Sequence, residues 1–213
     1  MKQIEMKACL ALASCLSMSS VGAVDNNDLK NTVILTGLLT NTFAIHNRAH
    51  FKPCDTVWQF GYMDGQDREM NTKTVRVSNL RCDMDTTDLL PQGLHFSVLP
   101  VALASVWTTQ QGPFAHRNEE IAFVPVGRFS WHQGAVVLDA SFGVGPALIA
   151  KTQFGYKRKS TLFQFSDEMG VGISDAKQRM RLGFTYRHIS NIDIKLPNNG
   201  MNFTGLDFTY RFE

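Results

Sequence analysis

Two residues near the C-terminal end of the chain, His188 and Ser190, are of types that carry out nucleophilic catalysis, and they lie two positions apart. Side chains alternate between the two faces of a β-strand, so residues two apart project to the same side. An adjacent imidazole can accept the proton of a serine hydroxyl, which is a weak nucleophile without such a base. If the segment is a strand, the spacing predicts a candidate serine hydrolase pair.

The segment that holds this pair alternates with period two. The face of His188 and Ser190 also carries apolar and aromatic side chains, and the opposite face carries three arginines: Met180, Leu182, Phe184 and Tyr186 against Arg179, Arg181 and Arg187. In a membrane barrel the apolar face points to lipid and the arginines fill a polar interior. Polar groups on a lipid-facing wall are costly and indicate function. The alternative is that they only mark the headgroup zone where the strand ends.

Similar alternation predicts further strands over 94–108, 120–131, 136–149, 160–173 and 201–212. Two more are expected between 32 and 82, where 32–39, 56–63 and 72–80 compete. The longest apolar run outside the N-terminal segment, 98–107, is about half of the ~20 residues that a membrane-spanning helix needs. Only closed barrels cross a membrane as strands. We therefore predict an all-β fold, an antiparallel transmembrane β-barrel of eight strands; a periplasmic β-sandwich is the alternative.

The N-terminal segment is typical of export. Lys2 and Lys7 precede a short apolar run over 8–13. Val21-Gly22-Ala23 has the small-x-small pattern of a signal peptidase site. We expect a signal peptide over 1–23 and one barrel domain over 24–213. A lipobox ending at Cys15 is the alternative, which would give a lipoprotein.

The composition bears on which ligands and partners the protein could bind. The chain has 21 basic and 19 acidic residues, so no global field favours nucleic acid. Cys54 and Cys82 would meet an oxidising compartment, which predicts a disulfide. His46 and His50 have a metal-like spacing but no further ligand at a defined offset, and we expect no metal.

Topology predicts where the pair lies. The last strand of an outer-membrane barrel ends in the periplasm, so the hairpin 191–200 that precedes it faces the cell exterior. His188 and Ser190 end one strand of this hairpin, and Asn202 begins the other. We therefore expect these three residues near the outer leaflet.

The segment from Tyr186 to Asn191, with Pro197-Asn198-Asn199-Gly200 after it, resembles the active-site region of the PagL-type lipid A 3-O-deacylases, whose hallmark is His-x-Ser-Asn followed by Pro-Asn-x-Gly. The resemblance covers about 136–212. It implies an eight-stranded outer-membrane barrel that hydrolyses the acyl ester at position 3 of lipid A, the anchor of lipopolysaccharide. It also implies Ser190 as nucleophile, His188 as general base and no cofactor.

This chain departs from the family at the third catalytic position, where Asn202 stands in place of a Glu. An asparagine can fix the tautomer of the imidazole but cannot stabilise the imidazolium as a carboxylate does. We expect an active enzyme weakened by Asn202. The alternative is a non-enzymatic barrel: an adhesin, a stabiliser or a small pore. Asp207 has the wrong parity to replace the Glu, and Asp193 is a weak substitute in the same hairpin.

The resemblance also suggests donors for the oxyanion that ester hydrolysis forms, namely the Asn198 side chain and the backbone N–H of Asp193. Asn191 is expected to support the loop. A basic cluster in the 150–159 connection, Lys151, Lys157, Arg158 and Lys159, could bind lipid A phosphates. An ordinary solvated loop near anionic lipid is the alternative for that cluster.

Overall fold

The computed structural model describes residues 26–67 and 69–212 of the chain. The expected signal peptide, its cleavage after Ala23 and the alternative lipidation of Cys15 lie outside these residues.

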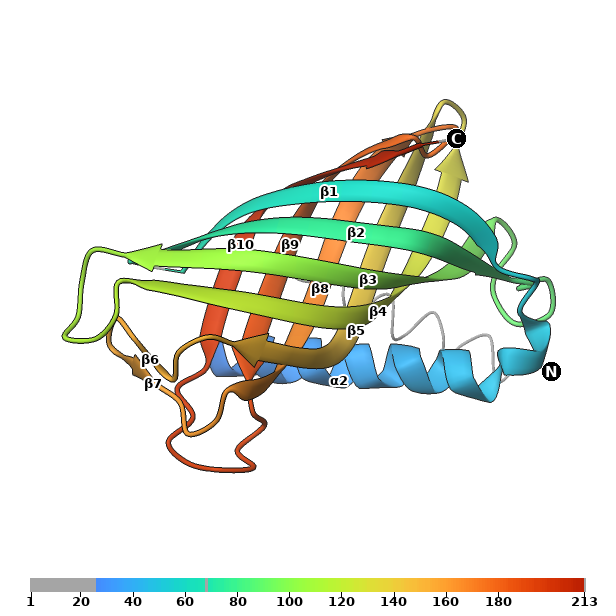
Figure 1. Cartoon of the computed structure of the whole chain (residues 1–213). Helices are drawn as coiled ribbons and strands as arrows, with labels where there is room; N and C mark the ends of the chain where they lie inside the picture. The colour runs from blue at the N-terminus through green and yellow to red at the C-terminus, as the bar shows by residue number, and fades with distance from the viewer. Residues whose placement is uncertain (1–25, 68, 213) are drawn as a thin grey trace.

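Eight antiparallel strands form a closed barrel (Figure 1). Each strand pairs with its neighbour along the chain, and the last pairs with the first to close the ring. The strands are β1 (Asp55–Asp67), β2 (Met70–Met84), β3 (Leu94–Thr109), β4 (Arg117–Gln133), β5 (Val136–Ile149), β8 (Phe163–Asp175), β9 (Met180–Ser190) and β10 (Met201–Arg211). The short β6 (Gln153–Phe154) and β7 (Lys157–Arg158) pair outside the barrel. The predicted antiparallel barrel and its six C-terminal strands are confirmed.

The outer wall of the barrel is apolar. Phe184, for example, is 51% exposed on the outward face of β9. Large apolar side chains are exposed around the wall, among them Phe60, Val75, Ile121, Phe123, Leu148, Val171, Leu182, Leu206 and Phe208. A soluble β-sandwich buries such a face in its core, whereas a membrane barrel turns it to lipid. The β-sandwich alternative is therefore wrong.

Ion pairs fill the interior. Arg187 is fully buried (0% exposed), and its Nη2 donates to both carboxylate oxygens of Glu120 at 2.8 and 2.9 Å and to Ser166 Oγ at 2.9 Å. Nearer the other end, Arg181 lies between the carboxylates of Asp139 and Asp207. A cavity of about 30 Å³ remains beside this second cluster, enough for only one or two water molecules. This interior is a packed core with no room for a pore at that level.

One expected strand candidate, 32–39, is wrong. These residues lie in the helix α2 (Asn26–His46), which runs along the outside of the barrel (Figure 1) and packs mainly on β5 and β8. Val33, Gly37 and Thr40 form its buried seam, at helical spacing. A Cβ at Gly37 would lie 3.1 Å from the Gly143 carbonyl oxygen, so the missing side chain permits close contact with the wall.

Among the described residues, no helix is both long and apolar enough to cross a membrane. A 3-10 turn, η1 (Arg48–His50), follows α2 and leads into β1. His46 and His50 both lie at this junction and are exposed.

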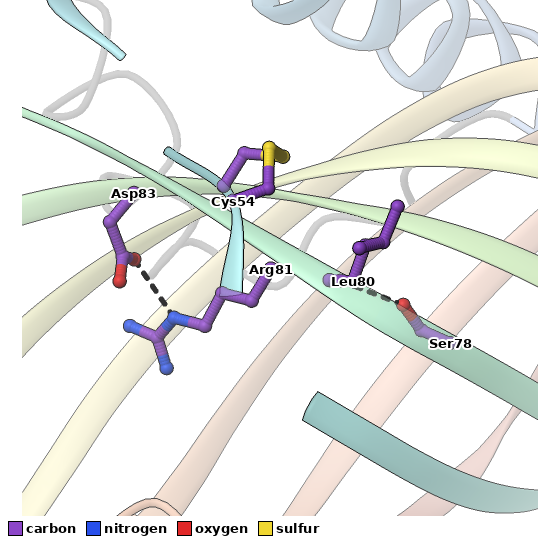
Figure 2. The surroundings of a disulfide bond; sticks show 6 residues. Cys54, Ser78, Leu80, Arg81 and Asp83 are labelled. Carbon is purple, nitrogen blue, oxygen red and sulfur yellow. Dashed lines mark hydrogen bonds and ion pairs between the residues drawn. A yellow bond between two sulfur atoms is a disulfide. The ribbon is translucent and has the colours of Figure 1, made fainter. Parts of the chain in front are cut away.

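Cys54 and Cys82 form a disulfide, as predicted. It joins the residue before β1 to a residue near the end of β2, at a point where the ladder between these strands is irregular. Figure 2 shows the bond near the ion pair of Arg81 and Asp83, whose Nε and Oδ1 atoms are 2.8 Å apart. The covalent link therefore joins the two strands just beyond the register shift between Thr56 and Gln59.

We predict that Glu120→Ala lowers the free energy of unfolding by about 3–5 kcal/mol, because it removes the only carboxylate within the described residues that is hydrogen-bonded to the buried Arg187 guanidinium. Glu168, 4.0 Å away, is then the nearest acidic side chain. Glu119→Ala is the matched control, since the exposed pair of Glu119 with Arg117 contributes at most about 1 kcal/mol. Urea unfolding in detergent micelles, followed by tryptophan fluorescence, measures both. Equal losses in the two variants would contradict the prediction.

Candidate active site

The pairing of β9 with β10 places His188 directly opposite Asn202. His188 Nδ1 lies 2.6 Å from Asn202 Oδ1, and the Tyr186 hydroxyl donates to the same oxygen at 2.9 Å. An amide oxygen only accepts hydrogen bonds, so Nδ1 carries the proton and Nε2 has a free lone pair. Asn202 thus fixes the tautomer that a general base requires.

Ser190 ends β9 on the same outward face as His188, and each side chain is 1% exposed. Its Oγ accepts a hydrogen bond of 3.4 Å from the backbone N–H of Ile192. Within the described part of the chain, His188 Nε2 has no hydrogen-bond partner. The imidazole is therefore held by Asn202 on one side and unengaged on the other, as a base needs to be.

Gly200 makes room for the imidazole. A Cβ at this position would lie 2.6 Å from His188 Cε1 and 3.4 Å from Nε2. The first separation is closer than real Cβ contacts come, so any larger residue would displace the ring. The glycine of the Pro-Asn-x-Gly motif thus has a steric role against the base.

The hairpin 191–200 is held together by asparagines. Asn191 Nδ2 donates to the Lys195 carbonyl at 2.8 Å and to Ser160 Oγ at 3.1 Å, which ties the loop to the neighbouring 159–162 connection. Asn191 is buried, and its backbone N–H donates to Asn198 Oδ1 at 3.2 Å. These contacts fit the expected support role of Asn191.

The two residues considered for the oxyanion interact with each other. Asn198 Nδ2 donates to Asp193 Oδ1 at 3.0 Å. Asp193 and the preceding Ile192 have φ values of 55° and 52°, in the left-handed region that glycine adopts most readily and that aspartate tolerates better than a β-branched residue does. The Asp193 carboxylate therefore engages an amide donor that a glycine at this position would leave unbound.

The basic cluster of the 150–159 connection divides into buried and accessible members. Lys159 is 6% exposed and donates from Nζ to the Ile189 carbonyl at 2.9 Å. Burial, with a smaller contribution from the charge of Lys157, lowers the pKa of Lys159 to about 7. Lys157 is half-buried and Arg158 exposed. Because Lys159 is engaged with β9, only Lys157 and Arg158 of these three remain accessible to a phosphate. Phosphate binding by these two residues stays a prediction.

Two side chains at the site were not among the sequence candidates. Tyr186 shares the acceptor of His188, and Asp167 on β8 pairs with His188 from the side opposite Asn202. A signal existed for Asp167: its odd number places it on the face of Phe163 and Phe165, where a carboxylate is out of place. Asp207, by contrast, points inward to Arg181, as its parity predicted.

Across residues 26–67 and 69–212, no group of three or more His, Cys, Asp or Glu side chains could hold a metal ion.

Comparison with known proteins adds three findings. Residues 78–211 match the family model described as lipid A 3-O-deacylase (PagL). The lipid A deacylase PagL of Bordetella bronchiseptica is 39% identical over 118 residues, which are 55% of this chain and 64% of that protein. A crystal structure of the outer membrane enzyme PagL superposes with a TM-score of 0.60 at 20% identity, covering 71% of this chain and 98% of that one.

We predict that Gly200→Ala slows the reaction of Ser190 with a fluorophosphonate, a reagent for activated serines, by at least about 10-fold, because the new methyl group displaces His188, the expected general base. Intact-protein mass spectrometry measures the labelling rate. Heat-modifiable migration on a gel checks that the variant still folds as a barrel. A folded variant labelled at the unmodified rate would show that the close contact has no effect on the base.

Proposed function

Because the chain belongs to the PagL family of lipid A 3-O-deacylases, we propose that it is a serine esterase that removes the acyl chain from position 3 of lipid A in the Gram-negative outer membrane. One observation carries the proposal: the His188 imidazole is oriented by Asn202 at 2.6 Å and projects from the same outward face of β9 as Ser190, two residues away. The matched region covers 64% of the curated relative.

The proposed reaction has two halves. Ser190 Oγ attacks the ester carbonyl carbon while His188 Nε2 accepts its proton, and the resulting imidazolium returns that proton to the departing sugar oxygen. This leaves an acyl-serine. Water then attacks with the same base, and a 3-hydroxy fatty acid and the free serine are released. No metal or cofactor takes part in either half.

The hairpin 191–200 supplies the hydrogen-bond donors that stabilise the oxyanion formed when Ser190 attacks the ester. The backbone N–H of Asp193 has no acceptor within the described part of the chain, and it lies in a turn that follows the nucleophile by three residues. Asn198 Nδ2 is the second donor, once it exchanges Asp193 Oδ1 for the substrate oxygen. Two such donors in a dry site are a large part of ester hydrolysis catalysis.

The position of the pair fits a substrate that is itself a membrane lipid. His188 and Ser190 lie at the end of the wall where the hairpin 191–200 and the β6–β7 connection gather (Figure 1). The acyl chains of lipid A would lie along the apolar wall below the pair. Its phosphates would meet Lys157 and Arg158 above.

The proposed function also requires that the chain be exported to the outer membrane. We retain residues 1–23 as a signal peptide and residues 24–213 as one outer-membrane barrel domain. The helix α2 begins at Asn26, shortly after the proposed cleavage site, which would make it the first element of the mature protein.

We predict that cells producing the chain lose the 3-linked acyl group from lipid A, and that Ser190→Ala abolishes this loss because the nucleophile is gone. Mass spectrometry of extracted lipid A measures both. Ser174→Ala, the same chemical change at the far end of β8, is the control and should leave deacylation intact. If the unmodified chain, folded in the membrane, removes no acyl group, the protein is a non-enzymatic barrel.

We predict that Asn202→Glu raises kcat by about 10- to 100-fold, because a carboxylate stabilises the imidazolium that an amide only orients. Asn202→Gln is the matched control, since it has the size of glutamate without the charge. Rates of fatty acid release from 3-O-acylated lipid A in detergent give the comparison. If the Glu variant is no faster than the Gln variant, charge at this position does not limit the reaction.

A further inference from the structure

Asp167 is an acidic residue on the outer wall of the barrel. It lies on β8 between Phe165 and Met169 on the outward face, and its register partner on β9 is His188. The side chain is 0% exposed. Within the described residues, neither carboxylate oxygen has a hydrogen-bond partner.

A carboxylate buried without a partner is costly and is not explained by packing. Other described positions at this level of the β8 outer face hold Phe163, Phe165 and Met169, so an apolar residue would fit the wall. On the β5 side, the register partner of Asp167 is Val144. Its place therefore calls for a function, and its register partner with a functional side chain is His188.

His188 is flanked on both sides of its strand. Asn202 on β10 and Asp167 on β8 are both its direct register partners, and the Cβ atoms of such partners lie about 4.5–5.5 Å apart. Asn202 contacts Nδ1 but carries no charge. The imidazole thus has an orienting amide on one side and a carboxylate on the other.

We propose that Asp167 supplies the negative charge that Asn202 lacks, and that it stabilises the imidazolium formed when His188 accepts the Ser190 proton. The identity of the ester rests on the proposed function. The role of Asp167 toward His188 rests on the strand register and on the burial of Asp167. Asp167 acts through His188, so it is a positioning residue and not a member of the reacting set.

The other charges around His188 oppose a positive charge on its imidazole. Three lysines, Lys30 on α2 with Lys159 and Lys157 on the connection above, are near enough to act on the imidazole. A positive charge that develops among them is opposed by all three. Asp167 is the carboxylate that β8 presents against the same ring.

Lys30 is also the cation that acts on Asp167, and Tyr186 is a titratable neighbour on β9. No ion pair joins Lys30 to Asp167 among the described residues, so the carboxylate is not neutralised by contact. At a separation of about 7 Å and an effective dielectric constant of about 20, its attraction for the imidazolium corresponds to roughly 10- to 100-fold in rate.

The test compares Asp167→Asn, which removes the charge and keeps the shape, in two backgrounds. In the otherwise unmodified chain, kcat for 3-O-acyl release should fall by about 10- to 100-fold with KM within about two-fold. In the Asn202→Glu background the same substitution should cost less than about three-fold, because the imidazolium already has a carboxylate. Heat-modifiable migration confirms that each variant folds.

Equal losses in the two backgrounds would mean a structural role and would overturn the inference, as would a loss under three-fold in the unmodified background. Fluorophosphonate labelling of Ser190 in the same four proteins provides a measurement independent of lipid A. If no variant hydrolyses lipid A but labelling follows the expected pattern, the proposed function fails and the role of Asp167 stands. If lipid A is hydrolysed and Asp167→Asn changes nothing, only the role of Asp167 fails.

Discussion

The antiparallel register of β9 between β8 and β10 is the constraint on which the candidate site depends. It sets His188 opposite Asn202 on one side and opposite Asp167 on the other. Because side chains alternate with period two, a slip of one residue would turn every outward side chain of the slipped strand inward. The backbone hydrogen bonds between these strands therefore set the position of His188 relative to Asn202 and Asp167.

The interior stabilises that register by charge. A slip of β9 would remove Arg187 from Glu120 and Arg181 from Asp139, leaving buried charges without partners. The same arginines alternate along the strand with the outward residues of the site. The inward face of β9 therefore carries the ion pairs, and its outward face carries the candidate site. A change in the register of β9 would disrupt both.

The outer wall is where this barrel differs from a simple apolar cylinder. At one end it carries an imidazole, a hydroxyl and a carboxylate, all buried, and over β5 and β8 it is covered by α2. Residues 78–211, which match the family model, do not include this helix. Lys30 near its beginning acts on both His188 and Asp167, so the helix contributes to the electrostatics of a site that the barrel strands build.

The sequence by itself determined the six C-terminal strands and their faces, because alternation depends only on neighbours along the chain. That was enough to place His188, Ser190 and Asn202 on one side of the wall and Asp207 on the other. It could not identify α2, since a helix that packs on an apolar wall through small residues such as Gly37 and exposes leucines on its other side shows no clear period. Nor could it reveal that Asp167 faces His188. Which residues meet across strands is decided by pairing between distant segments, and only the closed barrel fixes that register.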